Sequence, residues 1–333
     1  MNTFSPQRRN GYTLVELLVV TSIFATAFGM LTVANKPSVR SQIRRGAQSL
    51  ASVLVATQSR SLGREYGAAI VLEPSADDPN IASVIFNADV LPPIEGKAAG
   101  VPPAVLSSTT ATATVTPSNA DVAELQDGYK ICFYEKDQII QPRSVWMQFA
   151  PPSSAASANG TVSLRGASGQ STANTIWPSP ITPPFDVLIA RYPIKASQAA
   201  SLPKNAVVDL RFSGIGDDPS AGYGSLAGKG AVAISFDRVG GIESIMPHVF
   251  SSNSLRKLTP PVDPIVPIYL LVASRDDVGS GANTLKSETS VWVVINPQTG
   301  RAQVSNNVPQ SGSDAAALRA ARAKARAGIP LGK

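Results

Sequence analysis

One acidic residue, Glu16, lies inside a long apolar segment near the N-terminus. The segment begins at Tyr12 and continues in apolar or small residues to Ala34. An ionised carboxylate that faced lipid alone would cost about 2–3 kcal/mol or more. Glu16 therefore needs a partner that compensates its charge.

Residues suited to covalent or metal chemistry are scarce. The single cysteine, Cys132, excludes an intramolecular disulfide framework and a thiol-rich zinc site, and we expect it to be an inert buried side chain. The single histidine, His248, excludes a histidine-based metal cluster, and its neighbours resemble no nucleophile or base loop. We therefore expect no catalytic residues.

Two acidic pairs and one glycine-rich stretch are the other candidates for ligand binding. Asp217–Asp218 and Asp276–Asp277 lack the alternating oxygen ligands of a calcium loop, so we interpret both as solvated turns. The stretch 222–230 lacks the strand and hydroxyl placement of a phosphate-binding loop, and we expect a flexible loop. The sequence thus predicts no metal, no cofactor and no enzymatic activity.

The C-terminal segment 314–328 is rich in alanine and arginine. Asp314 near its start and Gly328 at its end predict a short helix. The net charge of the chain is +6, and its candidate anion- or DNA-binding residues lie on this helix: Arg319, Arg322, Lys324 and Arg326. The alternative is a solvated, frayed tail, because so short an alanine-rich helix is marginal in water.

The apolar segment is long enough to cross a membrane. About 20 helical residues span the roughly 30 Å of hydrocarbon, whereas a secretory signal needs only about 7–15. Arg8 and Arg9 precede it and favour a cytoplasmic N-terminus, while Arg40, Arg44 and Arg45 beyond it argue for the opposite orientation. We give more weight to Arg8 and Arg9, and we therefore expect the N-terminus to lie in the cytoplasm.

Gly11 followed by Tyr-Thr-Leu-Val-Glu resembles the signal of type IV prepilins. The resemblance implies that prepilin peptidase cleaves between Gly11 and Tyr12 and methylates the new N-terminal amine. Glu16 then becomes the fifth residue of the mature chain. Tyr12 departs from the phenylalanine that is usual at this position.

This cleavage would supply the partner that Glu16 needs. The new positive α-amine and a glutamate of a neighbouring subunit would neutralise each other inside a filament core. An ordinary signal anchor or a cleaved secretory peptide is the alternative, and it leaves Gly11 and Glu16 unexplained.

A second helix is expected after Pro37, which disfavours helix in the preceding residue. From Val39 to about Leu62, apolar residues recur at helical spacing and predict an amphipathic stalk packed on a sheet. These residues are Ile43, Ala47, Leu50, Leu54 and Leu62.

Three segments resemble the GspH/FimT family of pseudopilins. The first is the helix-to-strand junction 54–72, in which Gly63 and Gly67 end the helix and 69–72 is a buried strand. The others are the strand and turn 234–241 and the closing strand and turn 294–301. The resemblance implies a pilin-like α+β fold.

Several further segments have the composition and turn boundaries of strands. They are 128–134, 144–149, 185–192, 206–212, 231–236, 268–273 and 290–296. They predict an antiparallel β body on which the stalk helix packs. Stretches 91–119 and 151–184, rich in Ala, Ser, Thr and Pro, are expected to be surface loop insertions.

The sequence therefore predicts five regions. They are a leader (1–11), a transmembrane and filament-core helix (12–34), a stalk helix (35–66), a β-rich body (67–305) and a basic tail (306–333).

We expect a minor pilin or pseudopilin of a type IV pilus or a type II secretion system. It would have a single inner-membrane helix and an extracytoplasmic body. Its partners would be prepilin peptidase, other pilins and an inner-membrane assembly platform. The alternatives are a DNA-binding minor pilin and a membrane-anchored extracytoplasmic protein of another function, an enzyme included.

Overall fold

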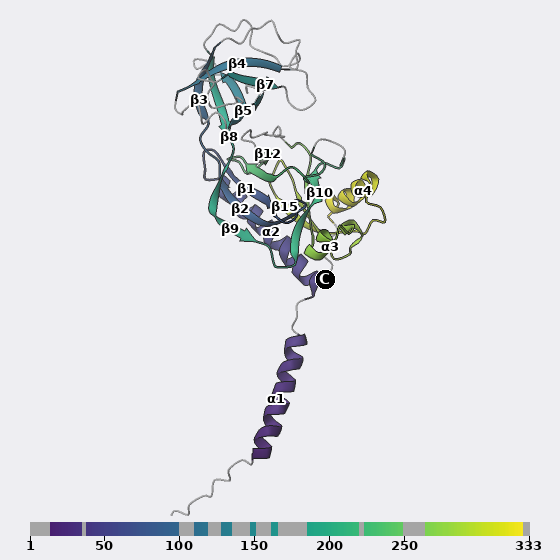
Figure 1. The fold of residues 1–333 in the computed structure, drawn as a ribbon. Coiled ribbons are helices and arrows are strands. Elements are labelled where there is room, and N and C mark those ends of the chain that lie inside the picture. The colour runs from purple at the N-terminus through teal and green to yellow at the C-terminus, as the bar shows by residue number, and fades with distance from the viewer. Residues whose placement is uncertain are drawn as a thin grey trace, which may run out of the picture.

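The computed structural model describes most of the chain. The described residues are 14–34, 38–99, 110–118, 128–134, 147–150, 161–165, 185–219, 223–248 and 264–328. Two helices begin this part of the chain, α1 (Leu14–Ala34) and α2 (Val39–Ser61). In Figure 1, α2 lies within the β body and α1 lies apart from it.

The body is built on an antiparallel sheet of nine strands among the described residues. Its main path runs β12-β11-β1-β2-β10-β13-β14-β15, and β9 pairs with the second half of β2. The strands are β1 (Ala68–Pro74), β2 (Ile81–Asp89), β9 (Ile194–Ser201), β10 (Ala206–Ile215), β11 (Ala231–Phe236), β12 (Ile242–His248), β13 (Ile268–Ser274), β14 (Val291–Ile295) and β15 (Ala302–Asn306).

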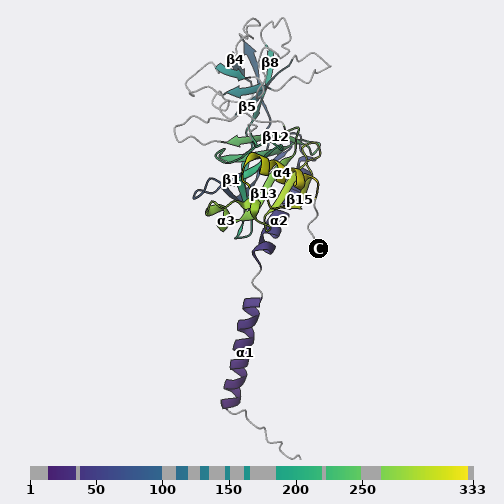
Figure 2. The ribbon, with the colours of Figure 1, turned by 90° about the vertical axis from the view of Figure 1, so that its right-hand side faces the viewer.

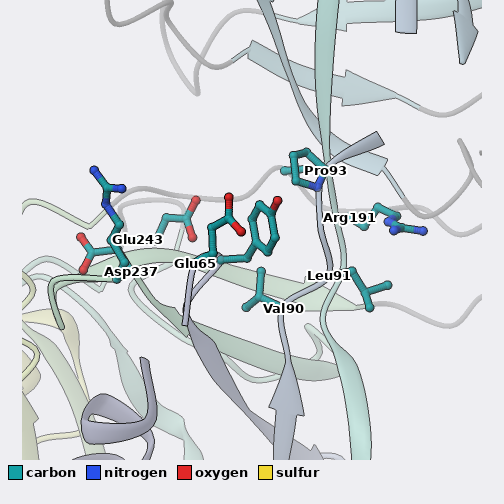
Figure 3. A pocket seen from close by; sticks show the side chains of 10 residues that line it. Glu65, Val90, Leu91, Pro93, Arg191, Asp237 and Glu243 are labelled. Carbon is teal, nitrogen blue, oxygen red and sulfur yellow. The ribbon is translucent and has the colours of Figure 1, made fainter. Parts of the chain in front are cut away.

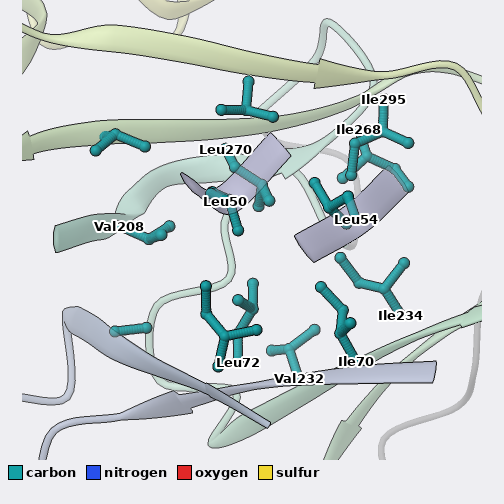
Figure 4. Packing of buried hydrophobic residues seen from close by; sticks show 14 of the residues in the cluster. Leu50, Leu54, Ile70, Leu72, Val208, Val232, Ile234, Ile268, Leu270 and Ile295 are labelled. Atoms are coloured by element: carbon teal, nitrogen blue, oxygen red, sulfur yellow. The ribbon is translucent and has the colours of Figure 1, made fainter. Parts of the chain in front are cut away.

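Helix α2 forms the centre of the main core. Its buried face places Leu50 and Leu54 among apolar side chains of strands from both halves of the sheet, as Figure 4 shows with Ile70 and Leu270. Full burial of each such leucine contributes about 1.5–3 kcal/mol. The helix also approaches β10 closely at Gly46, where a Cβ atom would lie 2.5 Å from that of Ala206. The stalk helix is thus an integral part of the body.

A smaller closed barrel is inserted between β2 and β9. Its strand order is β3-β4-β7-β6-β5-β8, and Figure 1 shows it at the end of the body away from α1. The strands are β3 (Ile94–Ala99), β4 (Thr110–Pro117), β5 (Gly128–Tyr134), β6 (Met147–Ala150), β7 (Thr161–Arg165) and β8 (Phe185–Arg191).

A C-terminal layer covers the face of the sheet opposite α2. It contains α3 (Arg275–Gly279), the 3-10 helix η3 (Thr284–Lys286) and α4 (Ala315–Arg326). Asp314 caps α4 by accepting a hydrogen bond of 2.9 Å from the amide of Ala317. Leu318 of α4 packs with Trp292 and Tyr269 of the sheet, and Figure 2 shows α4 lying over β13 and β15.

The sequence predicted the α+β class, the stalk helix and the described part of each strand that it named. The prediction that Leu62 belongs to the apolar face of the stalk helix is wrong, because Leu62 lies beyond the end of α2 and is 58% exposed. The stretches expected to be loops also need correction, since 91–119 contains β3 and β4 and 151–184 contains β7. The region boundaries stay predictions.

Candidate assembly site

Helix α1 presents apolar side chains in every direction. Each large apolar side chain from Leu14 to Phe24 is exposed, from 48% for Val19 and Val20 to 80% for Leu14. A helix that is apolar all round is normally buried in a core, a membrane or an assembly. The described body does not cover this part of α1.

The three hydroxyl groups described for α1 are satisfied within the helix itself. Thr21 donates to the carbonyl of Leu18 (3.0 Å), and Ser22 donates to that of Val19 (2.8 Å). Thr26 donates to the carbonyls of Ser22 and Ile23. Because these donors already have acceptors, the part of α1 from Leu14 to Thr26 can enter an apolar environment without exposing these hydroxyls unpaired.

Glu16 is the acidic residue in the first turn of α1. The partial positive charge of the helix N-terminus favours a carboxylate at this position. Gly11 and Tyr12, the predicted processing residues, lie outside the described residues. The structure therefore places one of the three predicted N-terminal site residues, at the start of the exposed apolar helix.

Residues 6–32 match the prokaryotic N-terminal methylation motif. The match includes Gly11, Tyr12 and Glu16, and it supports a type IV prepilin-like signal at the N-terminus. The chain matches no curated protein and no solved structure. In the part of the chain that the structure describes, no helix has the length and apolarity needed to cross a membrane.

The two turns that suggested a pseudopilin body meet at the end of α2. The side-chain amide of Gln58 donates to the carbonyl of Gly240 (3.3 Å) and to that of Thr299. The amide of Ile242 donates to the carbonyl of Pro297 at 2.7 Å. Sequence segments 234–241 and 294–301 thus form one structural unit with the stalk helix.

A pocket of about 190 Å³ lies where the loop after α2 meets the connection to the barrel. Figure 3 shows Glu65, Asp237 and Glu243 on one side of it and Pro93 and Arg191 on the other. No sequence pattern indicated this pocket, because its lining residues come from four separate segments.

Tyr66 also lines this pocket. Desolvation and the neighbouring Glu65 carboxylate raise the pKa of its phenol. Both effects disfavour a negative charge on the phenol, so Tyr66 is neutral near pH 7.

The C-terminal arginines do not form a free basic stripe. Arg322 is fully buried, and its guanidinium donates to the carbonyls of Gly216, Phe212 and Gly224 at 2.6–2.7 Å. Burial lowers its pKa to about 10. Its side chain is therefore not presented to any nucleic acid.

The neighbouring arginines pair with Asp217 and Asp218, which were predicted to lie in a solvated turn. Arg319 lies 3.3 Å from Asp218, and Arg326 lies 3.2 Å from Asp217, which also accepts a hydrogen bond from Tyr269. The expectation of a frayed tail is wrong, because α4 is packed on the sheet. DNA binding by this helix stays a prediction. Of its four candidate residues, Lys324 is exposed and has no ion pair among the described residues.

The stretch expected to be a flexible loop is also packed in its described part, 223–230. Leu226 is buried, and its amide donates to the carbonyls of Leu210 (3.1 Å) and Ser213 (2.9 Å). Gly224 supplies one of the acceptors of Arg322. This segment thus connects α4 to β10.

Proposed function

We propose that this chain is a structural, non-enzymatic subunit of a type IV pilus or of a type II secretion pseudopilus, as a minor pilin or pseudopilin. Prepilin peptidase cleaves it after Gly11, and Tyr12 becomes the methylated N-terminus. The observation that carries this proposal is the methylation motif over residues 6–32, which includes the exposed apolar part of α1.

The exposed surface of α1 supports a role in two apolar environments. Before assembly, the helix is held in the inner membrane with the body outside the cytoplasm. After assembly, it packs among the corresponding helices of other pilins. The internal hydrogen bonds of Thr21, Ser22 and Thr26 suit both environments, because these three hydroxyls keep their acceptors on transfer.

Glu16 gives the assembly its register. Its carboxylate would be costly in an apolar core unless an amine neutralises it. Cleavage after Gly11 creates an α-amine on Tyr12, four positions before Glu16 in the first turn of α1. A subunit that adds in the correct axial position brings the amine and a neighbour's carboxylate together.

The body is proposed to be of the GspH/FimT kind, with the inserted barrel as an addition. The support is the meeting of Gln58 with the two turns at Gly240 and Thr299, the segments whose sequences resemble that family. The partners of such a subunit are prepilin peptidase, other pilins or pseudopilins and an inner-membrane assembly platform.

Mass spectrometry of the mature N-terminus tests the processing step. The full chain is expressed with and without an active prepilin peptidase. We expect a methylated N-terminus at Tyr12 only when the peptidase is active. An intact N-terminus, or cleavage far beyond Gly11 in the presence of the peptidase, would contradict the proposal.

A substitution of Glu16 tests the assembly step. Glu16→Ala should leave membrane recovery and cleavage unchanged but strongly reduce incorporation into sheared filaments. Glu288→Ala removes one exposed carboxylate from the body and is the matched control. Normal incorporation of the Glu16→Ala variant would refute the charge-pairing role.

A further inference from the structure

The first two turns of α2 carry three arginines, Arg40, Arg44 and Arg45, which we call the arginine collar. Arg40 and Arg45 are exposed, and Arg44 is half-buried. Residues 17–64 contain no aspartate or glutamate. The collar therefore has no acidic neighbour on either helix after Glu16.

The described part of the body does not compensate the charge of the collar. Among the described residues, none of its three guanidinium groups has an ion-pair or hydrogen-bond partner. The two arginines at the other end of the helix differ, because Arg60 and Arg64 both pair with Asp89 of β2. The difference is thus local to the end of α2 that follows α1.

The position of the collar is unfavourable in isolation. The N-terminus of a helix carries a partial positive charge that repels cations, and the first turn of α2 contains no acid. Arg40 and Arg44 are also four residues apart, a spacing at which like charges repel each other on a helix. The helix is held instead by its buried face, with Ile43 and Ala47 in the core. An anion at this end would relieve the repulsion.

The place of the collar along the chain indicates where that anion lies. Arg40 follows the last residue of α1, Ala34, by six positions, a separation of about 9 Å if helical and about 20 Å if extended. The polar headgroup layer is about 5–7 Å thick on each side of a bilayer. If α1 is the membrane anchor, as the proposed function holds, the collar lies at or just beyond this layer and within about one Debye length of its charges.

We propose that the arginine collar binds the phosphate groups of anionic phospholipids at the extracytoplasmic surface of the membrane. Guanidinium groups match phosphate oxygens with paired hydrogen bonds, and three of them in two helical turns suit a surface that offers several phosphates. This contact holds the start of α2 against the membrane until the subunit enters the filament. The same contact explains why these arginines lie on the extracytoplasmic side of α1, where the positive-inside rule disfavours cations.

The lipids that the full chain retains from a mixed bilayer test this inference. The chain is reconstituted in nanodiscs that contain equal amounts of phosphatidylglycerol and phosphatidylcholine, and native mass spectrometry counts the lipids that it retains on release. The test variant is Arg40→Gln/Arg44→Gln/Arg45→Gln. The control variant, Lys204→Gln/Arg238→Gln/Arg301→Gln, loses the same charge from exposed positions of the body.

We expect the wild-type chain and the control variant to retain phosphatidylglycerol preferentially and the collar variant to lose that preference. A contribution of about fivefold per arginine gives a difference of about 100-fold for three. The preference should weaken as salt rises from 0.05 to 0.5 M, because the contact is electrostatic. No preference in the wild-type chain, or an unchanged preference in the collar variant, overturns the inference.

Two further readouts on the same samples separate this inference from the proposed function. N-terminal mass spectrometry that shows cleavage before Tyr12, together with no lipid preference, refutes only the lipid contact. An uncleaved leader in the presence of peptidase refutes the proposed function. If the collar variant instead changes self-association in cross-linking while its lipid ratio is unchanged, the collar is a contact between subunits and the lipid inference is wrong.

Discussion

The Nη2 atom of Arg322 lies 2.7 Å from the carbonyl oxygen of Phe212, a residue that precedes it by 110 positions. This bond joins the C-terminal helix to β10 through the interior of the protein. The guanidinium also lies over the ring of Tyr269, with 5.4 Å between Cζ and the ring centroid. The last helix of the chain is therefore fixed to the body by a buried cation rather than by its apolar residues alone.

Removal of the Arg322 side chain should destabilise the body. Arg322→Ala would leave three carbonyl acceptors without their donor and a cavity beneath α4, at a cost of about 3 kcal/mol in the free energy of unfolding. Lys324→Ala changes an exposed cation on the same helix and should stay within about 0.5 kcal/mol of wild type. Urea unfolding measures both, and equal losses would contradict the anchoring role.

Alkaline pH should unfold the body through its buried tyrosines. Burial raises the pKa of Tyr192, Tyr223 and Tyr269 above the ordinary value of 10, so each stays protonated in the folded state while its unfolded counterpart ionises. The stability that they contribute is complete below about pH 10 and is lost as pH rises further. Arg322, whose pKa is lowered to about 10, acts in the opposite direction above that pH but is a single group.

The urea midpoint measured between pH 8 and pH 11.5 tests this dependence. It should fall above about pH 10 in the wild-type protein. Tyr269→Phe removes one of the three groups and should make the decline less steep, while lowering stability at pH 8 because Asp217 loses its hydrogen bond from the phenol. An equally steep decline in this variant would show that Tyr269 does not contribute.

Local periodicity explains why α2 and most core strands were predictable. Ile43, Ala47, Leu50 and Leu54 are spaced by three or four residues, and all four are fully buried in the core. The barrel was missed because β4 and β7 have few large apolar residues and their pairing joins segments far apart in the sequence, as with Thr112 and Ser163.

The burial of Arg322 could not be predicted from its neighbours, because its acceptors lie about 100 residues away. A signal for the packing of α4 was nevertheless present, since Leu318, Ala321 and Ala325 share one helical face. At the assembly site, the position of Glu16 followed from its local motif. The arginine collar was visible in the sequence only as an objection to the membrane orientation.

The turn at Gly300 should tolerate no side chain. Gly300 has a φ of +64°, and a Cβ atom there would collide with the carbonyl oxygen of Gly240 in the facing turn. Gly228 has a similar φ of +68°, and a Cβ atom there would meet no other residue within 4 Å, so Gly228→Ala measures the cost of the backbone conformation alone. That cost is about 1–2 kcal/mol.

Gly300→Ala should therefore lower the free energy of unfolding by clearly more than Gly228→Ala, because it also separates the two turns that Gln58 joins. Urea denaturation of the two variants gives the difference directly. Equal losses would show that the facing turns can move apart without cost, and would weaken the case for a single unit at the end of α2.

A charge in the middle of α1 should separate assembly from folding. Phe24 is 59% exposed and contacts solvent in the isolated chain, so Phe24→Lys should change the unfolding free energy of the body by no more than about 0.5 kcal/mol. In a membrane or a filament core the same lysine costs about 2.5–3.5 kcal/mol. Phe24→Leu keeps the apolar surface and is the matched control. We expect normal urea unfolding for both variants but a strong loss of membrane recovery and filament incorporation for Phe24→Lys alone; normal incorporation of that variant would mean that this face of α1 remains in water after assembly.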